Sequence, residues 1–248
     1  IAQTLHDGGH TPDPAAIHAA AEALKEAMAD HLAPQLGPVY EAMACPGPYR
    51  PDAADAGKRA LRLAALSLLS RVDGPARAEA QFAGADNMTE QFGALGCLLE
   101  IGAGEAELAA FYDRWRAERL VIDRWFGLQA AHAAPDRAAD VAKTLSEHPD
   151  FEWKNPNRFR ALIGGLTGNA AGFHHASGAG YAFLADWLIR LDALNPQTAA
   201  RMSTAFETWR RYDADRQALI RAQLQRIAAT EGLSRDMSEM VGRMLGDA

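Results

Sequence analysis

The strongest constraint on the fold of this chain is a helical spacing of apolar residues without any competing strand pattern. Valine occurs only five times in 248 residues, and no run alternates β-branched or aromatic residues with polar ones. Alanine-rich segments instead place apolar residues three and four positions apart, which puts them on one face of a helix. The sequence therefore predicts an all-α protein.

Turn and capping residues divide this pattern into about a dozen helices of roughly 10–18 residues, joined by short loops. The first expected helix begins at 13–14. The others lie at about 61–69, 76–83, 87–101, 105–117, 119–132, 136–148, 155–167, 181–194, 196–209, 213–230 and 235–245. No motif recurs at a fixed period, which excludes ankyrin, tetratricopeptide and leucine-rich repeats. We therefore expect residues 1–248 to form a single helical domain, an irregular superhelix or solenoid of antiparallel helix pairs.

Composition and charge narrow the classes of partner. The formal net charge is −7 and the pI is near 5.6, which argues against duplex nucleic acid and anionic membranes as partners. The longest apolar stretches, such as 61–69, are too short to span a bilayer. Cys45 and Cys97 are the only cysteines and are far apart, which excludes the usual structural zinc site and favours a reducing cytoplasm.

Motifs that carry catalysis are missing from the sequence. There is no His-Glu-x-x-His pair, no phosphate loop and no nucleophile elbow. His174 and His175 would point about 100° apart on a helix and have no evident further ligands, so loop or core histidines are favoured over a metal site. The segment 177–180 superficially resembles a dinucleotide loop, but Phe183 replaces its third glycine and no strand precedes it. The sequence therefore predicts no catalytic residue, metal ligand or cofactor in this chain.

Two expected helix starts break the usual charge rule. Asn155-Pro156 and Asn195-Pro196 each read as an N-cap followed by proline at the first helical position. Helix N-termini favour acidic residues, yet Arg158, Arg160 and Arg201 follow these starts. Each arginine could simply pair with a nearby carboxylate. If both starts face one cavity, their amides and guanidinium groups would instead form a positive wall that orients peptide carbonyls or a distal carboxylate.

Several segments of the chain resemble the C-terminal domain of bacterial aminopeptidase N, a family of zinc-dependent alanyl aminopeptidases. These segments, which occur in the same order as in the family, are Asn87-Met88-Thr89, Leu120-Val121-Ile122-Asp123-Arg124-Trp125-Phe126, Asn155-Pro156-Asn157-Arg158-Phe159-Arg160-Ala161-Leu162-Ile163-Gly164, Gly178-Ala179-Gly180-Tyr181, Leu194-Asn195-Pro196-Gln197 and Arg210-Arg211-Tyr212-Asp213. The resemblance runs from about residue 58 to the C-terminus, and more loosely from Thr11.

The resemblance implies a truncated C-terminal domain of a larger, multidomain aminopeptidase that removes N-terminal residues from peptides. Zinc and the catalytic residues would belong to a catalytic domain of the same polypeptide, so this chain alone should be inactive. The helical domain of such enzymes closes over the active-site chamber. By that likeness Arg160, Gln197 and Arg201 would line the chamber and meet peptide substrates, with Arg158 in the same motif. The rival interpretation is a stand-alone α-helical scaffold that binds a protein or peptide through its concave face.

Overall fold

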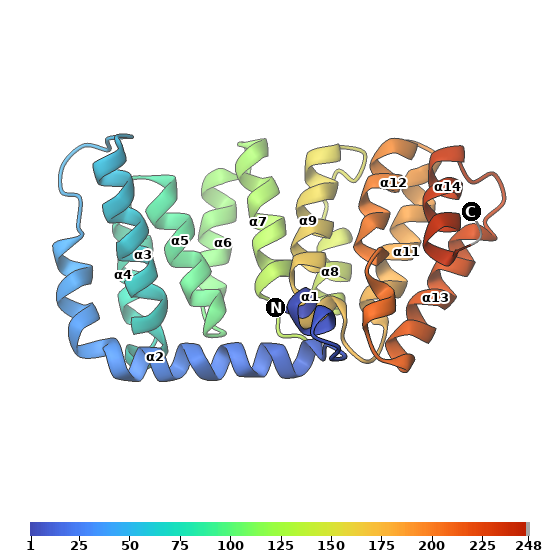
Figure 1. Ribbon diagram of the computed structural model, residues 1–248. Coiled ribbons are helices and arrows are strands. Elements are labelled where there is room, and N and C mark those ends of the chain that lie inside the picture. Colours follow the sequence, from blue (N-terminus) through green and yellow to red (C-terminus); the bar gives the residue numbers. More distant parts are fainter. Residues whose placement is uncertain (247–248) are drawn as a thin grey trace. The chain divides into compact units, whose positions relative to one another are not determined.

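The computed structural model describes residues 1–246, which form fourteen α-helices and two 3-10 helices, with no strand in that range (Figure 1). The α-helices are α1 (Ala2–Asp7), α2 (Pro14–Ala42), α3 (Ala53–Asp73), α4 (Ala76–Gly84), α5 (Met88–Glu100), α6 (Glu105–Trp115), α7 (Arg119–His132), α8 (Ala138–Ser146), α9 (Pro156–Gly168), α10 (Ala170–Phe173), α11 (Ala179–Asp192), α12 (Pro196–Ser203), α13 (Ala214–Ala228) and α14 (Arg235–Leu245). The 3-10 helices are η1 (Thr204–Phe206) and η2 (Trp209–Arg211). The all-α prediction is confirmed.

The predicted helix starts are confirmed by their caps. The Asn155 side chain accepts a hydrogen bond from the backbone N–H of Asn157, and the Asn195 side chain accepts one from Thr198. Asn87 caps α5 in the same way, and Ser234 caps α14. Each cap satisfies a backbone donor that has no partner inside its own helix.

The segment 196–209 differs from the single helix that the sequence predicts. Helix α12 ends at Ser203, and the chain continues through η1 and η2. The hydroxyl groups of Ser203 and Thr204 donate to the carbonyls of Ala200 and Arg201. A hydroxyl that donates to the carbonyl three residues earlier competes with the backbone hydrogen bonds of the helix. This competition favours a tighter 3-10 turn. The helices α1 and α10 were not predicted, because six and four residues are too few to show a period.

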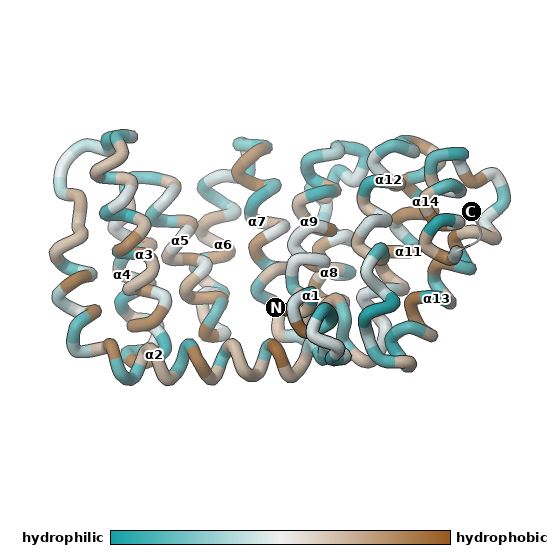
Figure 2. The backbone as a smooth tube through the Cα atoms, viewed as in Figure 1, coloured by the Kyte–Doolittle hydropathy of each residue, from teal (hydrophilic) through white to brown (hydrophobic). Residues whose placement is uncertain are grey.

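Contacts divide the chain into two compact units. Unit 1 comprises Ile1–His18 and the residues from Arg119 onward, and unit 2 comprises Ala19–Glu118. In unit 2, α5 packs against α3 and α4. In unit 1, α11 contacts α8, α10, α12 and α13, and this nearly all-apolar helix is buried between these neighbours. Hydrophobic and hydrophilic residues alternate along most helices, as expected where one face is buried (Figure 2).

Two glycines allow α7 and α9 to approach closely within unit 1. A Cβ atom on Gly165 would lie 2.3 Å from the carbonyl oxygen of Gly127, and one on Gly127 would lie 2.9 Å from that of Ala161. Real Cβ atoms do not come so near a backbone oxygen, so this contact requires glycine at both positions. The most extensive helix–helix contact in the described chain is this one. It fixes the position of α9 against α7.

Helix α2 is the least buried of the long helices. Among its apolar residues, Leu24 and Met28 are 61% and 41% exposed, while Ile17 and Leu32 are half-buried. The apolar residues of α2 are therefore only partly covered. Within residues 1–246 no helix has both the length and the apolar character that crossing a membrane requires.

Candidate functional site

Arg158, one of the predicted site residues, is buried and fully engaged. Its guanidinium group donates to the Asp123 carboxylate on α7, to the carbonyl of Asp150 and, at 3.4 Å, to the carbonyl of Arg119. It also lies 5.0 Å from the centre of the Phe126 ring. This buried ion pair explains why an arginine is tolerated in the first turn of α9, and it ties that helix start to α7.

Arg160, in the same helix start, is exposed. Its Nε donates to the carbonyl of Pro156 and its Nη2 to Oδ1 of Asn157, both at 2.9 Å. These acceptors are neutral, so the positive charge is not balanced by an ion pair with any residue that the structure describes. The structure therefore separates two arginines that the sequence groups together.

Gln197 and Arg201 are both exposed on α12. Their spacing of four residues places them on one face of that helix. Helix α12 contacts α9, where Arg160 and Thr167 are seven residues apart and so share a face about 10 Å long. No hydrogen bond or ion pair joins the Arg201 guanidinium to any other residue in the described range.

Arg201 lines a pocket of about 530 Å³ in unit 1, which we call the arginine pocket. The polar part of its lining consists of Thr167, Arg201, Thr204, Thr208 and Arg211, together with His174 and Tyr212. The apolar part consists of Ala2, Ala170, Phe173, Met202 and Ala205. Two arginines thus line a pocket whose described wall contains no aspartate and no glutamate.

Arg211 is the second cation of the arginine pocket. Its Nη1 donates to Oε1 of Gln3 at 3.1 Å, and its Nη2 donates to Oγ1 of Thr208. Its Nε is buried without a hydrogen-bond partner in the described structure. Both of these partners are neutral, so no carboxylate of the described residues balances the charge of this guanidinium.

A buried histidine lies beside these arginines. The two ring nitrogens of His174 are hydrogen-bonded to the hydroxyls of Tyr181 and Tyr212, at 2.9 and 3.0 Å. Burial, and then the charges of Arg211 and Arg216, lower the pKa of His174 to about 4. The ring is therefore neutral at pH 7, and of the two alternatives that the sequence leaves open, a loop or a core histidine, His174 is a core histidine.

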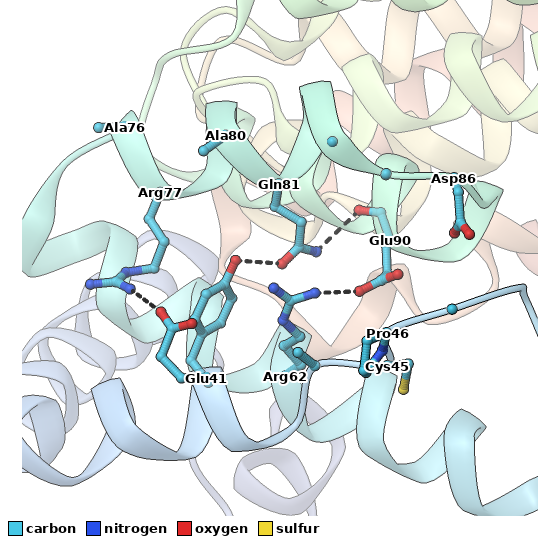
Figure 3. Close-up of a pocket in the computed structure, with 15 residues that line it drawn as sticks. Glu41, Cys45, Pro46, Arg62, Ala76, Arg77, Ala80, Gln81, Asp86 and Glu90 are labelled. Carbon is cyan, nitrogen blue, oxygen red and sulfur yellow. Dashed lines mark hydrogen bonds and ion pairs between the residues drawn. The ribbon is translucent and has the colours of Figure 1, made fainter.

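A larger pocket, of about 760 Å³, lies in unit 2, and we call it the paired pocket (Figure 3). It also contains two arginines, but carboxylates accompany them. Arg62 Nη1 lies 2.6 Å from Glu90 Oε1, and Arg77 Nη1 lies 3.2 Å from Glu41 Oε1. Both guanidinium groups stack on the ring of Tyr40, at 4.5 and 5.2 Å from its centre.

Internal pairing makes the paired pocket a weaker candidate for a ligand site, although it is the larger of the two. The Tyr40 hydroxyl donates to Oε1 of Gln81 at 2.9 Å, and Gln81 Nε2 donates to the carbonyl of Glu90 at 3.3 Å (Figure 3). Its two arginines already have carboxylate partners within the chain. Its interactions therefore hold α2, α3, α4 and α5 together.

Metal-binding groups do not cluster in the part of the chain that the structure describes. Residues 1–246 contain no group of three or more His, Cys, Asp or Glu side chains placed to hold an ion. Cys45 and Cys97 are free thiols, and burial raises the pKa of Cys97 to about 12, which makes it unreactive at neutral pH.

Sequence reasoning identified Arg201 but not its surroundings. The sequence does not predict Arg211, Thr208 and Thr167 as members of one pocket, because Thr167 lies on α9 whereas Thr208 and Arg211 lie at the start and end of η2. The only signal in the sequence is the run 210–213, which belongs to the family resemblance and does not by itself indicate a site. The structure does not bring Arg158 into this pocket.

A family model described as "Domain of unknown function (DUF3458_C) ARM repeats" matches residues 1–246. The chain belongs to this family of helical-repeat domains, which agrees with the superhelix expected from the sequence. Individual relatives have more informative names than the family description. The chain is 43% identical over 240 residues to aminopeptidase N of Caulobacter vibrioides and 36% identical over 239 residues to aminopeptidase N of Escherichia coli. These alignments cover 94% of this chain but only 28% and 27% of those proteins.

A solved structure gives the same result. The chain matches the crystal structure of Legionella pneumophila aminopeptidase A in complex with aspartic acid, with a TM-score of 0.88 and 29% sequence identity. The match covers 100% of this chain and 30% of that one. The chain therefore corresponds to the C-terminal helical part of aminopeptidases and spans little more than a quarter of their length, as the sequence motifs indicated.

Proposed function

We propose that the polypeptide carrying this chain is a zinc aminopeptidase that removes N-terminal residues from peptides. The observation that carries the proposal is the similarity to aminopeptidase N over nearly the whole chain. Zinc would be held in a catalytic domain of the same polypeptide and would activate a water molecule there. Residues 1–248 would form the non-catalytic C-terminal domain, and the two free thiols favour a reducing cytoplasm.

We further propose that this domain caps the active-site chamber and positions peptides within it. Arg160, Gln197 and Arg201 are exposed on two helices that contact each other, and Arg201 lines the arginine pocket. Arg158 would act differently from the other three, by holding the start of α9 in place from beneath. Positioning a substrate in this way lowers the entropic part of the barrier.

The test compares the full-length protein with the isolated chain. The full-length protein should release alanine from an alanine anilide, lose that activity when zinc is chelated, and regain it when zinc is restored. The isolated chain should show none. Turnover that copurifies with the isolated chain, or a full-length protein without aminopeptidase activity, would contradict the proposal.

Substrate positioning has its own test in the full-length enzyme. Arg201→Ala should raise KM for tetrapeptides by about tenfold, since a charge-assisted hydrogen bond is lost, and leave KM for a small anilide within about twofold. Arg221→Ala on α13, also an exposed arginine of unit 1, is the matched control. Equal effects of Arg201→Ala on both substrates would remove the distal role.

A further inference from the structure

The arginine pocket carries an unbalanced positive charge in a chain whose net charge is −7. Arg201 has no hydrogen-bond or ion-pair partner among the described residues, and Arg211 bonds only to neutral acceptors. By contrast, Arg158 and Arg226, also in unit 1, pair with carboxylates at hydrogen-bonding distance. Two guanidinium groups in one acid-free pocket are a site for an anion.

Hydrogen-bond donors complete this site. The Thr208 hydroxyl oxygen accepts from Arg211, which leaves its own proton available to a ligand. Nη1 and Nη2 of Arg211 each make one hydrogen bond to a neutral acceptor and each carry two protons. An oxyanion in the pocket would accept from the Arg211 guanidinium and from the Thr208 hydroxyl.

Size and lining indicate the kind of molecule that carries the anion. A volume of about 530 Å³ falls in the range of small-molecule sites and greatly exceeds that of a single ion. Phe173, Met202 and Ala205 add apolar surface beside the arginines. Inorganic phosphate would leave this surface unused, whereas an amino-acid residue bearing a carboxylate would use both parts.

We propose that the arginine pocket binds the carboxylate of a peptide, at its C-terminus or on an acidic side chain, through Arg201, Arg211 and Thr208. Arg201 would provide the exposed charge at the entrance. Arg211 would provide the second charge, and Thr208 would donate the additional hydrogen bond. The inference rests on the proposed function only in taking a peptide as the carrier of the carboxylate.

Binding of peptides that cannot be hydrolysed tests the pocket separately from catalysis. N-acetylated tripeptides have no free amine for an aminopeptidase to act on, and they can be made as the C-terminal acid, as the amide, or as the amide with one glutamate. Calorimetry on the full-length protein should show the acid binding about tenfold more tightly than the amide. Glutamate in the amide should restore binding if an acidic side chain is also accepted, and its failure to do so would assign the site to the peptide terminus.

Substitutions then link the acid preference to this pocket. Arg201→Ala and Arg211→Ala should each reduce the ratio of acid to amide affinity to about one, and Arg201→Glu should favour the amide. Arg221→Ala is the control that should keep the ratio, because this exposed arginine lies outside the pocket. Since Arg201 is exposed, its variants test the inference even if Arg211→Ala does not fold.

The outcomes separate this inference from the proposed function. If Arg201→Ala weakens the acid and the amide equally, the carboxylate site is refuted while a general positioning role stands. If the protein has no aminopeptidase activity but retains the Arg201-dependent preference for the acid, the pocket stands and the proposed function fails. Inorganic phosphate that binds more tightly than every peptide acid would also overturn the assignment.

Discussion

The two pockets use the same cations for opposite purposes. In unit 2 the arginines of the paired pocket meet carboxylates of their own chain, at 2.6 Å for Arg62 with Glu90 and 3.2 Å for Arg77 with Glu41. In unit 1 the arginine pocket has two guanidinium groups and no acidic residue in its described lining. The difference teaches that the neighbours of an arginine, rather than the arginine itself, decide whether its charge stabilises the fold or is available to a ligand.

The largest effect that the comparison predicts is on the stability of unit 2. Glu90→Gln keeps the shape of the side chain but leaves Arg62 mostly buried without a counter-charge, which should cost about 3 kcal/mol of local stability. Hydrogen exchange of the α4 and α5 amides in the full-length protein measures it. Glu41→Gln is the matched control, because its exposed pair with Arg77 should contribute less than about 0.5 kcal/mol. Similar losses in both variants would break the comparison.

The second expected effect is a dependence of the stability of unit 1 on pH. Folding lowers the pKa of His174 from 6.5 to about 4, so the unfolded chain binds the proton more readily. The stability should be complete above pH 6.5 and should fall by about 2 kcal/mol between pH 7.5 and pH 5, continuing down to about pH 4. His174→Gln, which retains a donor and an acceptor toward Tyr181 and Tyr212, should flatten this slope. Hydrogen exchange of the α11 amides, measured at several pH values, gives the slope of stability against pH in both proteins. The same slope in His174→Gln as in the unsubstituted protein would contradict the prediction.

Removing one buried tyrosine hydroxyl from each unit should lower the stability by a smaller and similar amount in both. The Tyr40 hydroxyl donates to Gln81 in unit 2, and the Tyr212 hydroxyl bonds to His174 in unit 1, both in buried surroundings. Tyr40→Phe and Tyr212→Phe should each lower the free energy of unfolding by about 1 kcal/mol, because a buried partner is left unsatisfied. Urea denaturation compares the two, and a loss confined to one variant would show that only one pocket depends on its tyrosine.

The smallest expected effect sharpens the comparison most. Arg201→Ala should change the stability of unit 1 by less than about 0.5 kcal/mol, because this exposed side chain has no partner in the described structure. Thermal unfolding of the variant beside Glu90→Gln measures the contrast. A loss comparable with that of Glu90→Gln would mean that Arg201 is a structural residue.

Much of the fold could be predicted from the sequence because local signals agree with the tertiary structure. Helix α7 has the predicted bounds. Asn155 and Asn195 cap the helices whose starts are predicted by the proline that follows each of them. The expected helix 196–209 could not be predicted correctly from periodicity, because the hydroxyls of Ser203 and Thr204 end α12 early. Local patterns predict where a helix starts better than where side-chain competition ends it.

The site was less predictable, because its partners are distant in sequence. Arg158 and Arg160 are two residues apart, yet Asp123, 35 residues earlier, makes one of them buried and leaves the other exposed. The arginine pocket likewise joins Arg201 to Arg211 and to Thr167 on α9. No spacing rule within one helix can reveal a carboxylate, or the lack of one, on a neighbouring helix.

The backbone contact between Gly127 and Gly165 has a mechanical consequence. With no side chain between them at that point, α7 and α9 can slide very little, and we expect them to open as one cooperative unit in native-state exchange. A ligand or domain that binds to the outer surface of α9 would then contact a rigid helix pair. A force applied at Arg160 would be resisted by α7 and α9 together.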